Sequence, residues 1–147
     1  MDYLTDPFGA GQLNRDILDW GVSVLRIVLG YIFLDSGLGK FRRGISGTGN
    51  WFAGLGMPAP QVTARLVASL ELFGGLLLIA GLFTHWVAIP LALNMVVATY
   101  VQKFKLRAPF QGGDVQGYEL DVLMVAASVT LVVAGAGTFS LDGLLNN

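Results

Sequence analysis

Charged and polar side chains lie within the long apolar stretches of this 147-residue chain, and four of them could act together: Arg26, Glu71, Asn94 and Glu119. An ionised group near the middle of a bilayer costs roughly 2.5–3.5 kcal/mol on insertion scales, so it faces protein or a wet cavity rather than lipid. A guanidinium and an amide donate hydrogen bonds to carbonyl oxygens, and a carboxylate can deliver protons. The set therefore suits a ligand with carbonyl oxygens that takes up protons.

Arg26 and Glu71 are the leading pair, because a long arginine side chain can span the difference in their predicted depths. One interpretation is a buried ion pair that fixes helix packing, since breaking such a pair is costly whether or not it does chemistry. The other is that Arg26, Glu71, Asn94 and Glu119 line a binding pocket. Replacing Arg26 with alanine separates the two interpretations, because only a pocket role predicts lost activity in a folded bundle.

Asp35 and Asp121 lie, on helical wheels, opposite the polar stripes of their own helices. Carboxylates directed at lipid are disfavoured, so this surface is predicted to be an interface with another membrane subunit or a second copy of the chain. Two alternatives stay open. One is water access near the membrane surface, and the other, for Asp121, is a first-turn acid favoured by the helix dipole.

The elements that must position these residues are membrane helices. The chain is 54% hydrophobic and 13% charged, whereas a soluble domain is about 25% charged. About 20 apolar residues are needed to cross a ~30 Å hydrocarbon core. The sequence therefore predicts an all-α, four-helix transmembrane bundle over residues 20–147, preceded by an exposed acidic tail over residues 1–19. The predicted spans are residues 20–39, 63–83, 86–104 and 118–138.

Small residues share a helix face with the charged ones. We predict that these faces turn toward the bundle, because small residues allow close helix approach in a membrane. In the last span this assigns Asp121, Ser128 and Gly135 to the outer face. The predicted inward stripes are Arg26, Gly30, Phe33, Gly37 and Lys40 in the first span, Ala64, Ala68, Glu71 and Gly75 in the second, and Glu119, Ala126, Thr130 and Gly137 in the last.

The connections between the spans predict an orientation. Lysine and arginine flank the first connection, within residues 40–65, and the last, within residues 103–107, while the middle connection has none. The positive-inside rule places both basic loops in the cytoplasm and both termini outside, in the plasma membrane of a bacterium. Around residues 48–57 we expect an interfacial or re-entrant segment, although an ordinary surface loop is an open alternative.

Short motifs are spread from about Leu25 to Leu144: Arg26, Gly30-Tyr31-Ile32-Phe33, Gly37 and Lys40; Gly54-Leu55-Gly56-Met57-Pro58; Glu71-Leu72-Phe73-Gly74-Gly75; Tyr118-Glu119; and Gly135-Ala136-Gly137 with Ser140-Leu141-Asp142. In this order they resemble the DoxX family of small membrane proteins. The resemblance implies a four-helix transmembrane bundle and a redox-linked membrane subunit, since some members are small subunits of a thiosulfate:quinone oxidoreductase. Asp35 and Asp121 are not part of the family pattern.

Together with the resemblance, the predicted pocket suggests a site for a quinone headgroup that is bound without a covalent bond. If the chain is an enzyme, it is then a subunit of a quinone-linked oxidoreductase. A non-catalytic assembly subunit is the alternative, with other membrane subunits or a second copy as partners. A small transporter or proton path is the third possible function, but four membrane spans without an internal repeat are few for a transporter.

Composition excludes other classes. A net charge of −1 gives no sign of a nucleic-acid partner. The chain has no cysteine for thiol chemistry. Its one histidine, His85, is expected to be exposed in a turn, so no metal site is predicted.

Overall fold

The computed structural model describes residues 10–113, 117–137 and 139–145. These residues form an all-α structure, as the sequence predicts. The helices are α1 (Ala10–Arg42), α2 (Ile45–Gly54), α3 (Pro60–Ala80), α4 (Thr84–Tyr100), the π-helical turn η1 (Val101–Lys105), α5 (Glu119–Ala134) and α6 (Leu141–Leu145).

Three helical stretches of the described chain are long and apolar enough to cross a membrane: Ile17–Arg42, Pro60–Ala80 and Thr84–Lys105. The fourth predicted span is shorter than expected. Helix α5 has 16 residues, a length of about 24 Å at 1.5 Å per residue. It ends where Gly135 (φ 80°) and Gly137 (φ 72°) take backbone conformations that favour glycine. The architecture is that of a membrane helical bundle with one short helix.

The first helix begins earlier than predicted. Residues 10–19, assigned from the sequence to an exposed tail, already belong to α1. Between Gly11 and Gly21 the chain contains neither glycine nor proline, so nothing interrupts the helix there. The rest of the predicted tail, residues 1–9, lies outside the described residues.

Helices α1 and α3 pack with their backbones almost in contact. A Cβ atom built on Gly75 would lie 2.6 Å from the carbonyl oxygen of Gly30, and one on Gly37 would lie 2.6 Å from the amide nitrogen of Leu72. Only glycine fits at such positions, as expected for close helix packing in a membrane. The predicted inward stripes of these two helices are therefore confirmed.

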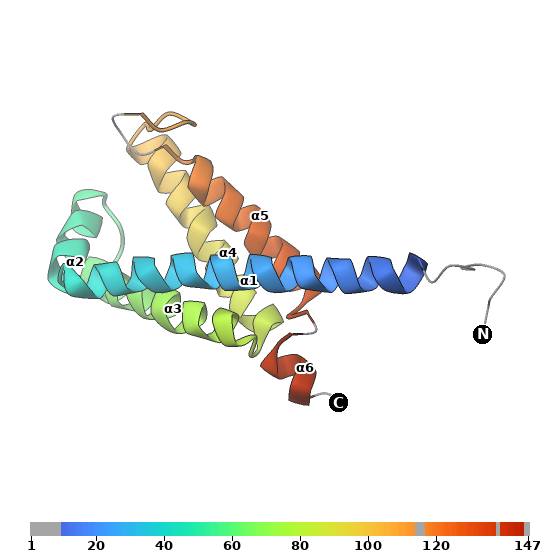
Figure 1. Ribbon diagram of the computed structural model, residues 1–147. Coiled ribbons are helices and arrows are strands. Elements are labelled where there is room, and N and C mark those ends of the chain that lie inside the picture. Colours follow the sequence, from blue (N-terminus) through green and yellow to red (C-terminus); the bar gives the residue numbers. More distant parts are fainter. Residues whose placement is uncertain (1–9, 114–116, 138, 146–147) are drawn as a thin grey trace.

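The four long helices form two antiparallel pairs, and the pairs diverge. Helix α1 lies along α3, and α4 lies along α5 (Figure 1). The pairs meet near the α3–α4 turn and separate toward the other end of the bundle, where α2 packs against α3. The apolar core lies where they meet. Its largest buried side chains are Leu29, Phe33, Leu78, Leu91 and Leu131.

The predicted interfacial segment 48–57 overlaps helix α2 and the turn that follows it. Phe52 is buried there and Trp51 is exposed. The amide of Gln61 donates to the side-chain oxygen of Asn50 at 3.0 Å, which ties α2 to the start of α3. Contact of this segment with lipid headgroups stays a prediction.

Candidate functional site

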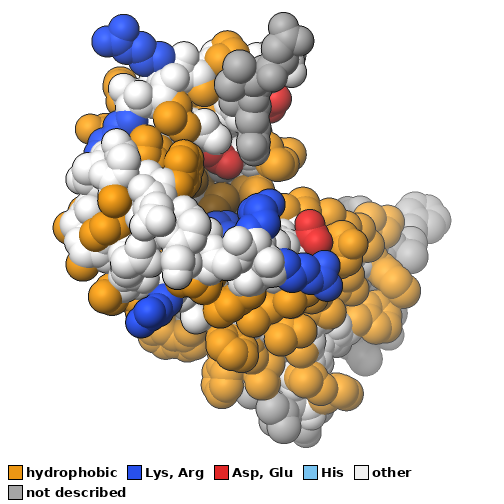
Figure 2. Space-filling view, turned by 90° about the vertical axis from the view of Figure 1, so that its left-hand side faces the viewer, with side chains coloured by type: hydrophobic (Ala, Val, Ile, Leu, Met, Phe, Trp, Pro, Cys, Tyr) orange, Lys and Arg blue, Asp and Glu red, His pale blue; other side chains and the backbone are white. Residues whose placement is uncertain are grey.

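A cavity of about 610 Å³ lies between the two diverging helix pairs. It opens at the end of the bundle that carries Lys40, Arg42, Arg43, Lys103 and Lys105, which we call the basic end. Figure 2 shows the molecule from this end, with a hollow between two lobes and lysine or arginine side chains around it. The polar residues of the cavity lining are Asp35, Ser36, Lys40, Arg43, Glu71, Asn94, Gln102 and Asp121.

Glu71 lies at the centre of this polar set and is 2% exposed. One carboxylate oxygen, Oε2, forms an ion pair with Lys40 of α1. The other, Oε1, accepts a hydrogen bond of 3.0 Å from the Asn94 amide of α4. The ammonium group of Lys40 also donates to the Ser36 hydroxyl at 2.9 Å. Both oxygens of the buried carboxylate are thus bonded, and Glu71 connects three helices.

Asp121 also faces this cavity, contrary to the sequence prediction. It is 9% exposed and lines the cavity together with Glu71. The inward face of α5 carries Asp121, Met124, Ser128 and Leu131, whereas the predicted residues Ala126 and Thr130 are exposed. Twelve of the 16 residues of α5 are apolar and the four polar ones are divided between two faces, so a helical wheel gives little indication of which face turns inward. The Oδ2 atom of Asp121 has no hydrogen-bond partner among the described residues.

Glu119 does not join the cluster. Its two carboxylate oxygens accept the backbone N–H of Gly112 at 3.0 and 3.2 Å, so it holds the loop before α5. Asp35 is exposed, as the wheel of α1 predicts, and lies in the cavity lining. Its interface role stays a prediction.

Arg26 lies at the opposite end of the bundle from Glu71 and does not pair with it, so the predicted ion pair is wrong. The side chain is 1% exposed, and its Nη2 donates to the carbonyl oxygen of Phe139 at 2.6 Å. Its guanidinium lies against Gly81 and Ser140. The remaining nitrogens, Nε and Nη1, have no hydrogen-bond partner in the part of the chain that the structure describes.

The register between α1 and α3 explains why Glu71 pairs with Lys40 and not with Arg26. Gly30 lies opposite Gly75 and Ile79, and Gly37 lies opposite Ala68 and Leu72. Continuing this antiparallel register places Arg26 beside the end of α3 and Lys40 beside Glu71. Sequence reasoning placed Lys40 on the correct face but gave it no partner. The sequence did contain a signal for this contact: Lys40 lies one helical turn after Gly37 and on the same face of α1, which packs against α3.

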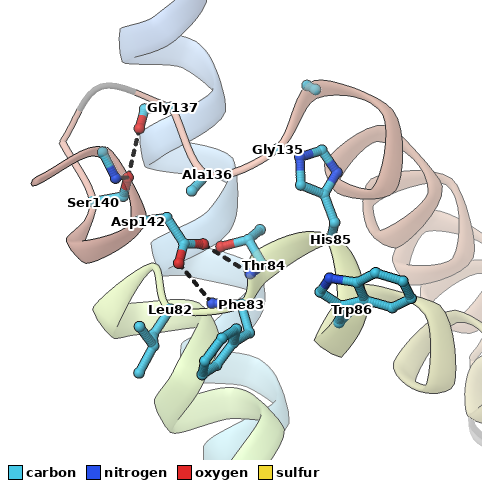
Figure 3. A pocket seen from close by; sticks show the side chains of 12 residues that line it. Leu82, Phe83, Thr84, His85, Trp86, Gly135, Ala136, Gly137, Ser140 and Asp142 are labelled. Atoms are coloured by element: carbon cyan, nitrogen blue, oxygen red, sulfur yellow. Dashed lines mark hydrogen bonds between the residues drawn. The ribbon is translucent and has the colours of Figure 1, made fainter. Parts of the chain in front are cut away.

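A second, smaller cavity of about 470 Å³ lies at the Arg26 end of the bundle (Figure 3). Asp142 reaches across it to the start of α4. Its two oxygens accept the backbone N–H groups of Phe83 and Thr84 at 2.9 and 3.1 Å. Asp142 therefore caps a helix from 58 residues away, as an N-cap residue does locally. This gives the Ser140-Leu141-Asp142 motif a structural role.

His85 is exposed, as predicted, although it belongs to the first turn of α4 rather than to a loop. Its Nδ1 lies 2.7 Å from the carbonyl oxygen of Val132, so this nitrogen carries the proton in the bond. No group of three histidine or acidic side chains that could hold a metal ion occurs within residues 10–113, 117–137 and 139–145.

The sequence model of the DoxX family matches residues 21–103. The chain is 36% identical over 122 residues to "Putative oxidoreductase CatD" of Bacillus subtilis, covering 83% of this chain and 84% of that protein. It is 30% identical to "Uncharacterized membrane protein Rv3486" of Mycobacterium tuberculosis, over 85% and 81% of the two chains. It is also 30% identical to "Inner membrane protein YqjF" of Escherichia coli, over 90% and 97%. No solved structure matches the chain significantly.

Proposed function

Because the chain belongs to the DoxX family of membrane proteins, we propose that it is a small subunit of a redox-linked membrane complex and that its cavity binds a quinone headgroup. The observation that supports this most is the partly buried cluster of Lys40, Glu71 and Asn94, with Asp121 beside it, in a cavity between apolar helices. The printed name of the Bacillus subtilis relative agrees with a redox role.

The size and lining of the cavity fit such a headgroup. Ligand pockets typically enclose about 300–1,000 Å³ and are mostly apolar, with a few polar groups that fix orientation. The cavity at the basic end encloses about 610 Å³. Trp51, Phe52, Met57, Met95 and Met124 supply flat or adaptable apolar surface. A planar ring can lie against these side chains while its oxygens face the polar cluster.

A bound quinone supplies the capacity to accept electrons and protons. The residues of this chain bind, orient and hold protons. The ammonium of Lys40 and the amide of Asn94 are hydrogen-bond donors at the cavity surface. Glu71 holds both of them in place, and Asp121 offers a carboxyl group. We assign the electron-donating centre to a partner subunit of the complex.

The position of the cavity determines from which side of the membrane a bound quinone headgroup would take up protons. It opens at the basic end, which the positive-inside rule assigns to the cytoplasm. A headgroup there exchanges protons with the cytoplasmic side of the plasma membrane. This orientation is part of the proposal.

Titration of the detergent-purified protein with decylubiquinone, followed by the quenching of tryptophan fluorescence, tests the proposal, because Trp51 is the one of the three tryptophans that lines the cavity. We expect saturable binding to the wild type. We also expect binding about tenfold weaker in Asn94→Leu, the loss of roughly one buried hydrogen bond. Asn50→Leu is the matched control, because Asn50 bonds to Gln61 outside the cavity lining. No saturable binding by the wild type, or equal loss in both variants, would contradict the proposal.

A non-catalytic assembly subunit is the second candidate, because Glu71 satisfies both of its oxygens within the chain, with no ligand needed. In that case the cluster fixes the packing of three helices. A stable complex with a partner protein and no affinity for decylubiquinone would favour this role.

A further inference from the structure

Two buried carboxylates face the cavity at the basic end, and their surroundings differ. Both oxygens of Glu71 are bonded, one to the ammonium of Lys40 and one to the amide of Asn94. Asp121 is 9% exposed, and its Oδ2 atom has no hydrogen-bond partner among the described residues. The two acids therefore cannot have the same role.

Burial is the main reason that the ionised form of Asp121 is unfavourable; the carboxylates of Glu71 and Glu119 add to it, and the ammonium of Lys40 opposes it. Lys40 of α1 and Glu71 of α3 are near enough to act on it, as is Glu119 of its own helix. The ammonium of Lys40 is already paired with Glu71. Two further charged residues, Asp35 and Arg43, lie in the lining of the same cavity, and both are exposed. An ionised Asp121 would be a second carboxylate at one shared cation, with an oxygen that has neither proton nor donor.

We infer that Asp121, and not Glu71, carries the dissociable proton of the cavity and donates it in a hydrogen bond to an oxygen of the bound headgroup. This inference rests on the proposed quinone function and adds to it the residue that holds the proton. Glu71 is then a positioning residue, because it fixes Lys40 and Asn94. Asp121 lines the cavity, and its unpartnered Oδ2 is shielded from solvent, so a proton on this carboxyl group removes a charge that neither water nor a donor would stabilise.

The expected consequences differ between substitutions of Asp121. In Asp121→Asn the amide still donates a hydrogen bond, so decylubiquinone binding should stay within about threefold of the wild type, which is less than the value of one hydrogen bond. In Asp121→Ala the donor is gone, and binding should weaken by about tenfold. Asp121→Glu should retain both the donor and the proton. A purely structural role for Asp121 predicts no such dependence on a donor group.

Infrared spectroscopy of the full-length protein in lipid vesicles tests the proton directly. A protonated carboxylic acid has a carbonyl stretching band that an ionised carboxylate lacks. We expect this band in the wild type, a shift of the band when decylubiquinone is added, and its loss in Asp121→Asn. It should persist in Glu71→Gln and in the matched control Asp35→Asn, which removes an exposed acid from the same cavity. Circular dichroism verifies that each variant is folded, and Asp121→Ala, which also lacks the carboxyl group, provides a second variant if the asparagine variant is not.

The outcomes separate the inference from the proposed function. Decylubiquinone binding to the wild type without an Asp121 band would overturn the inference and leave the proposed function standing. An equal loss of the band in Glu71→Gln and Asp121→Asn would also overturn it. An Asp121 band in a protein that does not bind decylubiquinone would overturn the proposed function and the donation to a headgroup together. A band that shifts with decylubiquinone and disappears only in Asp121→Asn supports both.

Discussion

Lys40 on α1 and Glu71 on α3, 31 positions apart in sequence, form a partly buried ion pair that joins the two helices. The side chain of Lys40 is 17% exposed and that of Glu71 is 3% exposed, so the lysine reaches from the cavity toward a carboxylate that water hardly touches. Asn94 completes the arrangement from α4. The ion pair thus links α1 to α3 and also forms part of the polar lining of the cavity.

Removing Lys40 alone should destabilise the bundle strongly. Lys40→Met leaves Glu71 without its counter-ion, and breaking one side of a buried ion pair costs about 3–5 kcal/mol. The double variant Lys40→Met with Glu71→Leu should recover most of this loss, because two apolar side chains replace the pair. Thermal unfolding in detergent measures both effects. Lys103→Met, an exposed lysine at the same end, is the control and should change the midpoint little. Additive losses in the double variant would contradict the pairing.

Arg26 should matter for the C-terminal segment rather than for quinone binding. Arg26→Ala removes the hydrogen bond to Phe139, and a bond from a charged group is worth about 1.5–3 kcal/mol. We expect faster hydrogen exchange over residues 139–145 and unchanged affinity for decylubiquinone. Arg65→Ala replaces an exposed arginine and should alter neither. Loss of affinity for decylubiquinone in Arg26→Ala would contradict this prediction and would indicate that Arg26 takes part in quinone binding.

The close approach of α1 and α3 depends on glycine at position 75. A Cβ atom there would lie 2.6 Å from the carbonyl oxygen of Gly30, which is backbone and cannot move aside. Gly75→Ala should therefore lower the free energy of unfolding by about 1–3 kcal/mol, as overpacking does. Gly21→Ala adds the same atom to α1 where nothing lies within 4 Å, and it should stabilise the helix by up to about 1 kcal/mol. Equal melting behaviour of the two variants would argue against this packing.

Asp35 supports a prediction about assembly. It lines the cavity and is also exposed on α1, where a carboxylate in contact with lipid would be disfavoured, so we expect a partner subunit or a second copy to cover its exposed side. Mass measurement in mild detergent should show a species larger than the monomer for the wild type and a shift toward the monomer for Asp35→Leu. A monomer in both cases would remove the prediction.

The sequence was informative where one helix face differs clearly from the other. Arg26, Gly30, Phe33 and Gly37 recur at helical spacing, and the structure buries all four. The register between helices is a different matter, because it depends on where each helix begins and on which glycines meet. Helix α1 starts at Ala10 instead of residue 20, so depths counted from its predicted midpoint paired Glu71 with Arg26 rather than with Lys40.

The rotation of α5 could not be predicted for a related reason. Asp121 and Thr130 lie on different faces of α5, so polar residues occur on both faces of a largely apolar helix, and nothing in the helix itself shows which face is buried. Packing against α4 decides this, and it turns Asp121 into the cavity. The role of Asp142 was hidden too, since it caps α4 from 58 residues away and no local pattern reveals a cap at that distance.

Photoaffinity labelling with an azido-quinone in native membranes tests the central claim most directly, because it reports where a quinone lies without requiring a known electron donor. The account predicts labelling of peptides from the cavity lining, within residues 31–43, 94–102 or 120–124, with the label competed away by decylubiquinone and reduced in Asn94→Leu. Labelling confined to the Arg26 end of the bundle, or labelling that decylubiquinone does not compete, would contradict it.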